Sequence, residues 1–297
     1  MADFAVNDPA SSRDPEHHSH AMDHYVVAGN PVEHSQSPFI HAEFARQTGQ
    51  AMAYGRALFP LDGFDAALRT LVASGAKGCN ITVPFKFHAF RAAARHTPRA
   101  ALAQAANVLR FDADGWLADN TDGAGLVADI ERGAGVALAG KRLLLIGAGG
   151  ASAGVLGPLL DAGPCALVVA NRTAQKAHAL VARHATVAGR CALSASSLAD
   201  CGLGFDVVVN ASASSMAGVA APVAADVFAP GALALDLMYG PKAQPFLAWA
   251  KAHGANPRDG LGMLVEQASA AFELWRGVRP STGAVLAALR ERQRSAA

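Results

Sequence analysis

The sequence predicts an α/β protein with two successive lobes, and three observations support this prediction. Short apolar runs alternate with helix-like segments from Tyr25 onward, which is the pattern of parallel sheets covered by helices. A glycine-rich turn separates a strand-like run from a helix-like run at residues 143–160. The chain has 297 residues, of which 52% are hydrophobic and 16% charged, so it can fill two hydrophobic cores.

The first lobe is predicted to hold three strands, at residues 25–28, 51–59 and 78–83. A helix is expected to start with Ser37 as its N-cap and Pro38 at its first position, and to end at Gly49. Further helices are predicted at residues 64–73, 89–95 and 100–106. Residues 108–118 are expected to form a hairpin that turns at residues 112–115.

The second lobe is expected to begin with a helix from Asp122 to Arg132 and to continue through the strand, turn and helix of residues 143–160. Further strands are predicted at residues 166–170, 206–210 and 233–237, and helices at 245–252, 261–276 and 282–292. The last two helices are expected to pack back on the first lobe. The predicted domains are therefore residues 24–121 with 259–297, and residues 122–258, after a disordered extension of residues 1–23.

Composition excludes several classes of protein. The net charge of +1 gives no reason to expect a nucleic-acid partner. The cysteines are widely spaced, which indicates reduced thiols in a cytoplasmic protein; they are Cys79, Cys165, Cys191 and Cys201. Residues 1–23 lack the apolar core of a secretory signal. Within them, His17, His18 and His20 are interpreted as part of an unstructured extension, and no metal site is predicted.

Residues 143–160 carry no charge and reach the length of a membrane span. They also contain five glycines and Pro158, and this composition favours a strand, a turn and a helix over a transmembrane helix. The protein is therefore not expected to bind a membrane.

The segment 143–154 reads L-L-L-I-G-A-G-G-A-S-A-G, which is the order of a phosphate-binding turn. Backbone N–H groups at a helix N-terminus point toward an anion, and the helix dipole favours it. Gly147 permits the tight turn, and Gly149 lets the backbone approach a pyrophosphate. Ser152 stands where the G-x-G-x-x-G pattern has its third glycine. The turn therefore predicts a dinucleotide site.

The end of the next predicted strand indicates which dinucleotide binds. An NAD site usually has an acidic residue there, which accepts hydrogen bonds from the ribose hydroxyls. This chain has Asn171, Arg172 and Thr173 instead, with Lys176 one turn later. A carboxylate would repel a 2′-phosphate, whereas an arginine beside a hydroxyl would bind it. The sequence therefore predicts NADP.

Three motifs in the first 123 residues place polar side chains near predicted strand ends: H-S-Q-S-P at 34–38, N-I-T-V-P-F-K at 80–86 and D-N-T-D-G at 119–123. Strand alternation puts Asn80 and Thr82 on one face, with Ile81 and Val83 on the other. Lys86 then lies just past the strand end. Open α/β sheets bind ligands beyond the carboxyl ends of their strands, so we expect these polar groups around one crevice.

Each of these residues also has a simpler interpretation. Ser37 and Asp122 are suited to helix capping, and a single lysine such as Lys86 is usually a solvated surface residue. Together with a predicted NADP turn in the other lobe, the three motifs favour an active site.

The motifs closely resemble those of the shikimate dehydrogenase family. The resemblance keeps their order, covers Tyr25 to about Gly277, and rests on H-S-Q-S-P, N-I-T-V-P-F-K, D-N-T-D-G, G-A-G-G-A-S, N-R-T, Y-G-P-K at 239–242 and D-G-L-G-M-L-V-E-Q at 259–267. It implies an N-terminal substrate-binding lobe, a Rossmann-like NADP-binding lobe, and C-terminal helices that return to the first lobe. The implied reaction is the reversible NADPH-dependent reduction of 3-dehydroshikimate to shikimate, in the biosynthesis of chorismate and aromatic amino acids.

The resemblance also implies roles for individual residues. The catalytic pair would be Lys86 and Asp122, where an ammonium stabilises and protonates the oxygen that gains charge. The substrate would contact Ser35, Ser37, Asn80, Thr82, Lys86, Asn107, Asp122, Tyr239 and Gln267, with Ser35, Ser37 and Tyr239 at its carboxylate. The cofactor would contact Gly147, Ala148, Gly149, Gly150, Ala151, Ser152, Asn171, Arg172, Thr173, Lys176, Met238, Gly260 and Met263, the last three near the nicotinamide.

Several positions depart from the family pattern; among them, Leu237 stands at the methionine position of D-M-x-Y, apolar for apolar. Val108 replaces the threonine of A-V-N-T, and Ser215 replaces the final glycine of N-A-T-S-S-G. Three other activities stay open: a quinate or shikimate dehydrogenase that uses NAD, a paralogue for an amino analogue of shikimate, and a nonenzymatic NADP-binding regulator. Arg172 favours NADP over NAD, and the presence of both Lys86 and Asp122 favours an enzyme. A monomer or homodimer is expected.

Overall fold

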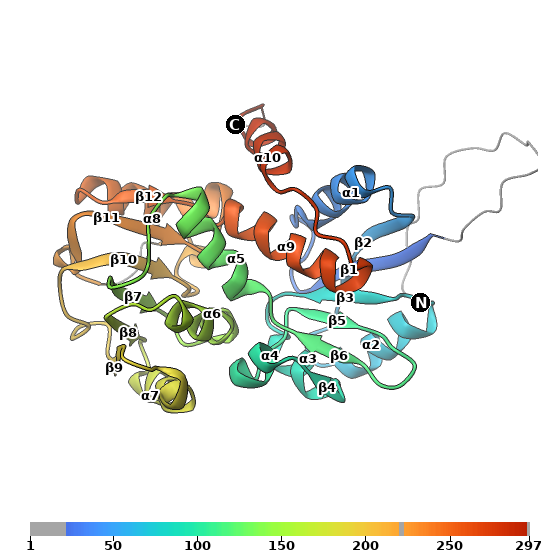
Figure 1. The fold of residues 1–297 in the computed structure, drawn as a ribbon, viewed down its shortest axis with the longest axis horizontal. Helices are drawn as coiled ribbons and strands as arrows, with labels where there is room; N and C mark the ends of the chain where they lie inside the picture. Colours follow the sequence, from blue (N-terminus) through green and yellow to red (C-terminus); the bar gives the residue numbers. More distant parts are fainter. Residues whose placement is uncertain (1–21, 220–222, 296–297) are drawn as a thin grey trace, which may run out of the picture.

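The computed structural model describes residues 22–219 and 223–295 of the chain. Figure 1 shows two groups of strands and helices side by side, with helices α5 and α9 running between them. The predicted N-terminal extension, including His17, His18 and His20, lies outside the described residues except for its last two positions. Of these, Asp23 already belongs to the first strand.

The first sheet has six strands in the order β2-β1-β3-β5-β6-β4. They are β1 (Asp23–Gly29), β2 (Met52–Leu58), β3 (Gly78–Ile81), β4 (Arg95–His96), β5 (Val108–Arg110) and β6 (Leu117–Asp119). β1 pairs in parallel with β2 and β3, whereas β5 pairs antiparallel with β3 and β6. The prediction of a hairpin at 108–118 is confirmed. Because that hairpin returns antiparallel to β3, the expectation of a parallel sheet is wrong for this lobe.

The second sheet has six strands in the order β12-β11-β10-β7-β8-β9, and its pairings are parallel. They are β7 (Arg142–Ile146), β8 (Ala166–Ala170), β9 (Ala192–Ser196), β10 (Phe205–Asn210), β11 (Phe228–Asp236) and β12 (Asn256–Arg258). The two edge strands, β9 and β12, were not predicted from the sequence. One is rich in alanine and serine and the other contains Pro257, and weakly apolar or proline-bearing strands are typical of sheet edges.

The helices cover the faces of the sheets (Figure 1). They are α1 (Ser37–Thr48), α2 (Phe64–Ala73), α3 (Lys86–Ala92), α4 (Pro98–Ala103), α5 (Asp122–Ala128), α6 (Gly150–Asp161), α7 (Ala174–His184), α8 (Gln244–Ala252), α9 (Leu261–Arg276) and α10 (Gly283–Ser295). The predictions for α2 and α9 are confirmed residue for residue. α5 ends earlier than predicted and continues as a π-helical turn, Asp129–Gly133. α7 is an additional helix, not among those predicted.

Several other helix ends also differ from the prediction. Gln36 occupies the N-cap position of α1, and Ser37 is the first helical residue. The Ser37 N–H donates to Oγ of Ser35 at 3.3 Å, so Ser35 supplies the hydroxyl expected from Ser37. α3 starts at Lys86 instead of residue 89. α4 stops at Ala103 because Gln104 adopts a left-handed φ of 50°, which a helix cannot continue through.

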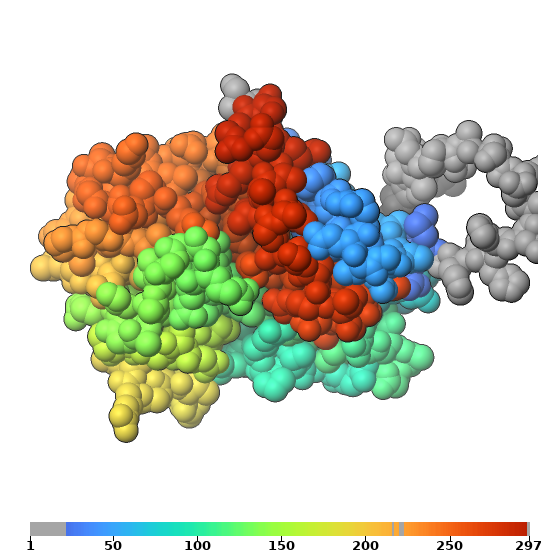
Figure 2. All heavy atoms as spheres, turned by 45° about the horizontal axis from the view of Figure 1, so that its top comes forward, coloured from blue at the N-terminus to red at the C-terminus, as the bar shows by residue number. Residues whose placement is uncertain are grey.

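The last two helices pack against the first lobe, as predicted. Leu261 and Phe272 of α9 and Leu289 of α10 share one core with Tyr25 of β1 and Phe44 of α1. Figure 2 shows the corresponding surfaces of α9 and α10 beside α1. This return brings residues near position 267 to the first sheet.

Residues 143–160 form β7, the glycine turn and α6, as predicted. No helix in the described parts of the chain is long and apolar enough to cross a membrane.

Candidate active site

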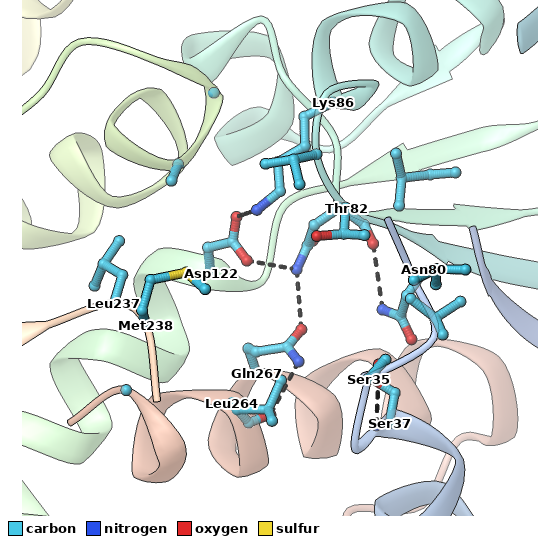
Figure 3. A pocket seen from close by; sticks show the side chains of 18 of the residues that line it. Ser35, Ser37, Asn80, Thr82, Lys86, Asp122, Leu237, Met238, Leu264 and Gln267 are labelled. Atoms are coloured by element: carbon cyan, nitrogen blue, oxygen red, sulfur yellow. Dashed lines mark hydrogen bonds and ion pairs between the residues drawn. The ribbon is translucent and has the colours of Figure 1, made fainter. Parts of the chain in front are cut away.

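A pocket of about 460 Å³ lies where the carboxyl ends of strands from both sheets meet (Figure 3). Its walls include the segment after β1, the end of β3, the start of α6, the segment after β11 and the start of α9. All nine side chains implied to contact the substrate line it: Ser35, Ser37, Asn80, Thr82, Lys86, Asn107, Asp122, Tyr239 and Gln267. Residues up to 232 positions apart, Ser35 and Gln267, therefore share one cavity.

Lys86 and Asp122 form an ion pair within this pocket (Figure 3). Their side chains are 14% and 7% exposed, so the pair is largely shielded from water. Asp122 is the first residue of α5 and makes no capping hydrogen bond with its side chain, which rejects the simpler interpretation as a helix cap. One carboxylate oxygen accepts from Lys86, and the other accepts from Nδ2 of Asn107 at 2.9 Å. The ammonium is thus held in place where it can donate a proton into the pocket.

The Asn107 amide connects three elements around the ion pair. Its Nδ2 donates to Oδ1 of Asp122 at 2.9 Å and to Oε1 of Gln267 at 3.0 Å, and it also lies 2.9 Å from Oγ1 of Thr121. Its Oδ1 accepts from the Thr121 N–H at 2.8 Å. Gln267 in turn donates to the carbonyl of Leu264 at 2.9 Å (Figure 3). The network fixes the start of α5 and the side of α9 relative to the first sheet.

A group of hydroxyls occupies another side of the pocket. Oγ of Ser35 donates to Oγ of Ser37 at 3.1 Å, and Nη2 of Arg56 donates to the Ser35 carbonyl at 2.6 Å. Burial raises the pKa of Tyr239, which keeps its hydroxyl protonated and able to donate. Neutral donors of this kind suit a carboxylate ligand.

Asn80 and Thr82 both line the pocket, as strand alternation predicts. Ile81 packs in the core with Cys79 and Phe85, on the other face of β3 from Asn80, as the alternation predicts. Val83 lines the pocket and is 38% exposed, so the prediction of an opposite face is wrong for this residue. The reason is that β3 ends at Ile81, and beyond the strand the alternation of side chains no longer holds.

The glycine turn lies at the carboxyl end of β7, directly beside the end of β8. Gly147 has a φ of 114°, a conformation that favours glycine. Its N–H donates to the main-chain carbonyl of Ala170 at 2.7 Å. A Cβ built on Gly149 would meet no heavy atom within 4 Å, so the backbone there is open to a ligand. The turn therefore fits the pyrophosphate of a dinucleotide.

The residues predicted to bind the cofactor fall into two groups. Five line the pocket: Gly150, Ala151, Met238, Gly260 and Met263. Eight do not line it: Gly147, Ala148 and Gly149 in the turn after β7, Ser152 in α6, Asn171, Arg172 and Thr173 in the segment after β8, and Lys176 in α7. Arg172, Thr173 and Lys176 are exposed there, while Ser152 is fully buried in α6.

Beneath Met238, the carboxylate of Asp236 is fully buried among donors. It accepts from the Met238 N–H at 2.8 Å, from Nδ2 of Asn210 at 3.0 Å and from Oγ of Ser215. Burial raises the pKa of Asp236. Ser215, which departs from the family pattern, thus supplies a hydrogen bond that a glycine cannot make. Another departure, Val108, is buried in β5 opposite Asn80.

Several pocket residues were absent from the predicted set: His34, Phe87, Leu237, Lys242 and Leu264. His34 and Lys242 lie inside the H-S-Q-S-P and Y-G-P-K motifs, so the sequence offered a reason to expect them at the site. It offered no such reason for the apolar residues, because an isolated leucine or phenylalanine in sequence is normally part of a core. Within residues 22–219 and 223–295, no cluster of three or more His, Cys, Asp or Glu side chains is arranged to hold a metal ion.

Comparison with known proteins assigns most of the chain to one family. Residues 27–109 match the shikimate dehydrogenase substrate binding domain, residues 130–230 the shikimate / quinate 5-dehydrogenase model, and residues 260–290 the shikimate 5′-dehydrogenase C-terminal domain. The chain is 64% identical to the shikimate dehydrogenase (NADP(+)) of Methylibium petroleiphilum, over 91% of this chain and 95% of that protein. It is 58% identical to the protein of the same name from Verminephrobacter eiseniae, over 91% and 94%.

Solved structures give the same result. An Ael1 enzyme from Pseudomonas putida superposes with a TM-score of 0.81 at 46% identity, over 90% of this chain and 98% of that chain. Shikimate 5-dehydrogenase from Thermus thermophilus, in complex with NADP(H) and shikimate, superposes with a TM-score of 0.77 at 30% identity, over 91% and 99%.

Proposed function

The chain belongs to the shikimate dehydrogenase family, and from this membership we propose that its pocket binds shikimate beside NADP, with Lys86 and Asp122 as the catalytic pair. The reaction is the reversible NADPH-dependent reduction of 3-dehydroshikimate to shikimate, which serves aromatic biosynthesis. The observation that carries the residue assignment is the shielded ion pair of Lys86 and Asp122 in a pocket between the two sheets.

The chemistry of the reaction suits this pair. When bound, NADPH supplies a hydride to the carbonyl carbon of the substrate. Lys86 stabilises the negative charge that develops on the carbonyl oxygen and donates its ammonium proton to that oxygen. Asp122 orients the ammonium through the ion pair, and Asn107 holds Asp122 through its second oxygen. In the reverse direction Lys86 accepts the proton of the substrate hydroxyl.

The remaining pocket residues divide by chemistry. Ser35, Ser37 and Tyr239 bind the carboxylate of shikimate through hydroxyl donors. The ring hydroxyls of shikimate, and the part of its ring next to the carboxylate, contact side-chain groups that can both donate and accept hydrogen bonds. These groups belong to Asn80, Thr82, Asn107 and Gln267.

For NADP, the turn from Gly147 to Ala151 holds the pyrophosphate with backbone N–H groups. Asn171, Arg172, Thr173 and Lys176 contact the adenosine ribose and its 2′-phosphate; the pairing of Ile146 with Ala170, at the ends of β7 and β8, supports this assignment. Met238, Gly260 and Met263 lie near the nicotinamide, in accord with their position in the pocket wall.

The separate sheets support a substrate-binding domain of residues 24–121 and 259–297 and an NADP-binding domain of residues 122–258. We place the enzyme in the cytoplasm, because its cysteines are unpaired and its cofactor is NADPH. It acts as a monomer or a homodimer.

The test is an absorbance assay at the NADPH band with shikimate and NADP. We expect turnover with this pair, and far slower turnover with quinate, which carries an extra hydroxyl at the carboxylate-bearing carbon. Comparable kcat/KM values for quinate, or for NAD in place of NADP, would assign the broader quinate/shikimate activity. NADP binding without turnover of shikimate, quinate or an amino analogue would identify a regulator instead of an enzyme.

A further inference from the structure

We infer that Tyr54 is a positioning residue for the substrate: its hydroxyl holds the side-chain amide of Asn80 so that an N–H group of that amide faces the pocket. This inference rests on the proposed function, in which Asn80 binds shikimate. Tyr54 itself does not belong to the pocket lining. It acts through Asn80 and does not touch the substrate.

The orientation of the Asn80 amide follows from its two partners. Nδ2 of Asn80 donates to the main-chain carbonyl of Asn107 at 3.2 Å. A carbonyl oxygen only accepts, so the nitrogen of the amide must be on that side. Oδ1 of Asn80 then points to the Tyr54 hydroxyl, 2.6 Å away, and the hydroxyl must be the donor. Asn80 is 6% exposed and lines the pocket (Figure 3). Its Nδ2 has a second hydrogen that the Asn107 carbonyl does not use, and this hydrogen can serve a ligand.

Tyr54 reaches Asn80 across a strand. β1 lies between β2, which carries Tyr54, and β3, which carries Asn80. Two residues further along the same face of β2, Arg56 donates to the carbonyl of Ser35 at 2.6 Å. The edge strand β2 therefore supports two parts of the pocket wall, Asn80 and the backbone at Ser35, through residues that do not line the pocket.

The Tyr54 ring is held by aromatic neighbours. It stacks on the imidazole of His41 with ring centroids 4.2 Å apart and planes 8° apart, and Trp275 lies 6.2 Å away. Burial lowers the pKa of His41 to about 3, so the imidazole is neutral at physiological pH. Burial also raises the pKa of Tyr54 well above its ordinary value, which keeps the hydroxyl protonated as the donor that Asn80 requires.

The test is a set of variants assayed with shikimate and NADP: Tyr54→Phe, Asn80→Ala, and both together. Tyr54→Phe keeps the ring and its stacking but removes the donor, so the buried Asn80 oxygen loses its partner and the amide can turn. One such hydrogen bond corresponds to roughly a three- to tenfold change in binding. We therefore expect KM for shikimate to rise by about that factor, with much smaller changes in kcat and in KM for NADP.

Tyr25→Phe is the matched control. Tyr25 is a buried tyrosine of β1 that packs on the same Trp275, with ring centroids 4.6 Å apart, whereas the Asn80 oxygen accepts from Tyr54. This variant should leave both KM values near those of the wild-type enzyme. General damage to the aromatic cluster would instead change the kinetics of both variants alike.

The double variant separates the inference from the proposed function. If Tyr54 acts through Asn80, Tyr54→Phe adds no further increase in KM once Asn80 is alanine. Additive effects of the two substitutions, or an unchanged KM for shikimate in Tyr54→Phe alone, would overturn the positioning role. If Asn80→Ala itself leaves KM for shikimate unchanged, then the assignment of Asn80 to the substrate fails, and the positioning role with it.

Discussion

Gly150, the first residue of the helix that follows the glycine turn, lies against the aliphatic chain of Lys86. A Cβ built on Gly150 would be 3.3 Å from Cβ of Lys86. The predicted phosphate-binding helix of one sheet and the predicted catalytic lysine of the other are thus in direct contact. This contact joins the two lobes at the ion pair of Lys86 and Asp122, which the proposed function makes the catalytic pair.

Replacing Lys86 tests the catalytic assignment. Lys86→Ala should lower kcat and kcat/KM together, because the ammonium stabilises charge that exists only in the transition state. General acid–base groups contribute about 10²–10⁴-fold, and we expect a loss of that size in steady-state assays. Lys77→Ala is the control, since this exposed lysine precedes the same strand at its other end. A variant of Lys86 with near-normal kcat and a raised KM would make it a binding residue only and leave catalysis to Asp122.

Replacing Arg172 tests the cofactor assignment. Arg172→Asp removes a charge-assisted contact to the 2′-phosphate and adds a repulsive carboxylate. The loss of the contact alone is worth about 1.5–3 kcal/mol, or about ten- to hundredfold in affinity for NADP. Affinity for NAD should change much less, as measured by titration of both cofactors. The control Arg190→Asp changes an exposed arginine beyond the other end of α7, and it should have little effect. An unchanged preference for NADP in Arg172→Asp would place the phosphate elsewhere.

Replacing Gly260 tests how tightly the pocket is packed on the side proposed to hold the nicotinamide. A Cβ at this position would lie 2.3 Å from the carbonyl oxygen of Leu237, so Gly260→Ala must displace the backbone beside Met238. Overpacking of this kind costs about 1–3 kcal/mol of stability. We expect that loss in urea unfolding, together with a larger rise in KM for NADP than for shikimate. Gly283→Ala is the control, because a Cβ there meets no atom within 4 Å. Wild-type stability and KM in Gly260→Ala would contradict this account.

His41 predicts a pH dependence of stability. Its pKa in the folded protein is about 3, below the ordinary value of 6.5, so the unfolded chain binds the proton more tightly. The stability associated with neutral His41 is therefore fully present above about pH 6.5 and is lost as the pH falls toward 3. Between pH 7 and pH 5 this loss amounts to about 2 kcal/mol of unfolding free energy.

His41→Phe should remove that contribution while keeping an aromatic ring against Tyr54. Neither ring nitrogen of His41 has a hydrogen-bond partner among the described residues, so the replacement should not weaken the core at neutral pH. The measurement is urea unfolding at pH 7 and pH 5. The exposed His178 provides the control His178→Gln, which should keep the wild-type pH dependence. Equal pH dependence in His41→Phe and the wild-type protein would show that folding does not lower the pKa of His41.

Much of the fold follows from local patterns. The strand, turn and helix at 142–161 and the helices 64–73 and 261–276 were predictable because hydrophobic spacing and glycine positions act over a few residues. The edge strands β9 and β12 were not, since their pairing comes from neighbours far away in the chain and not from their own composition. The start of α3 at Lys86 was missed for a related reason: the residues directly before the helix, V-P-F at 83–85, include no side chain that can cap it, and Phe85 holds the N-cap position.

For the site, the sequence by itself determined which chemical groups are present: a lysine, a carboxylate, amides, hydroxyls and a glycine turn, in motifs whose order identifies the family. It did not determine their contacts. The ion pair of Lys86 with Asp122 and the link from Asn107 to Gln267 join residues 36 and 160 positions apart. The support of Asn80 by Tyr54 likewise depends on the strand order β2-β1-β3. Hydrogen bonds act over about 3 Å, so only the tertiary structure, which sets distances between remote segments, decides which of these groups meet.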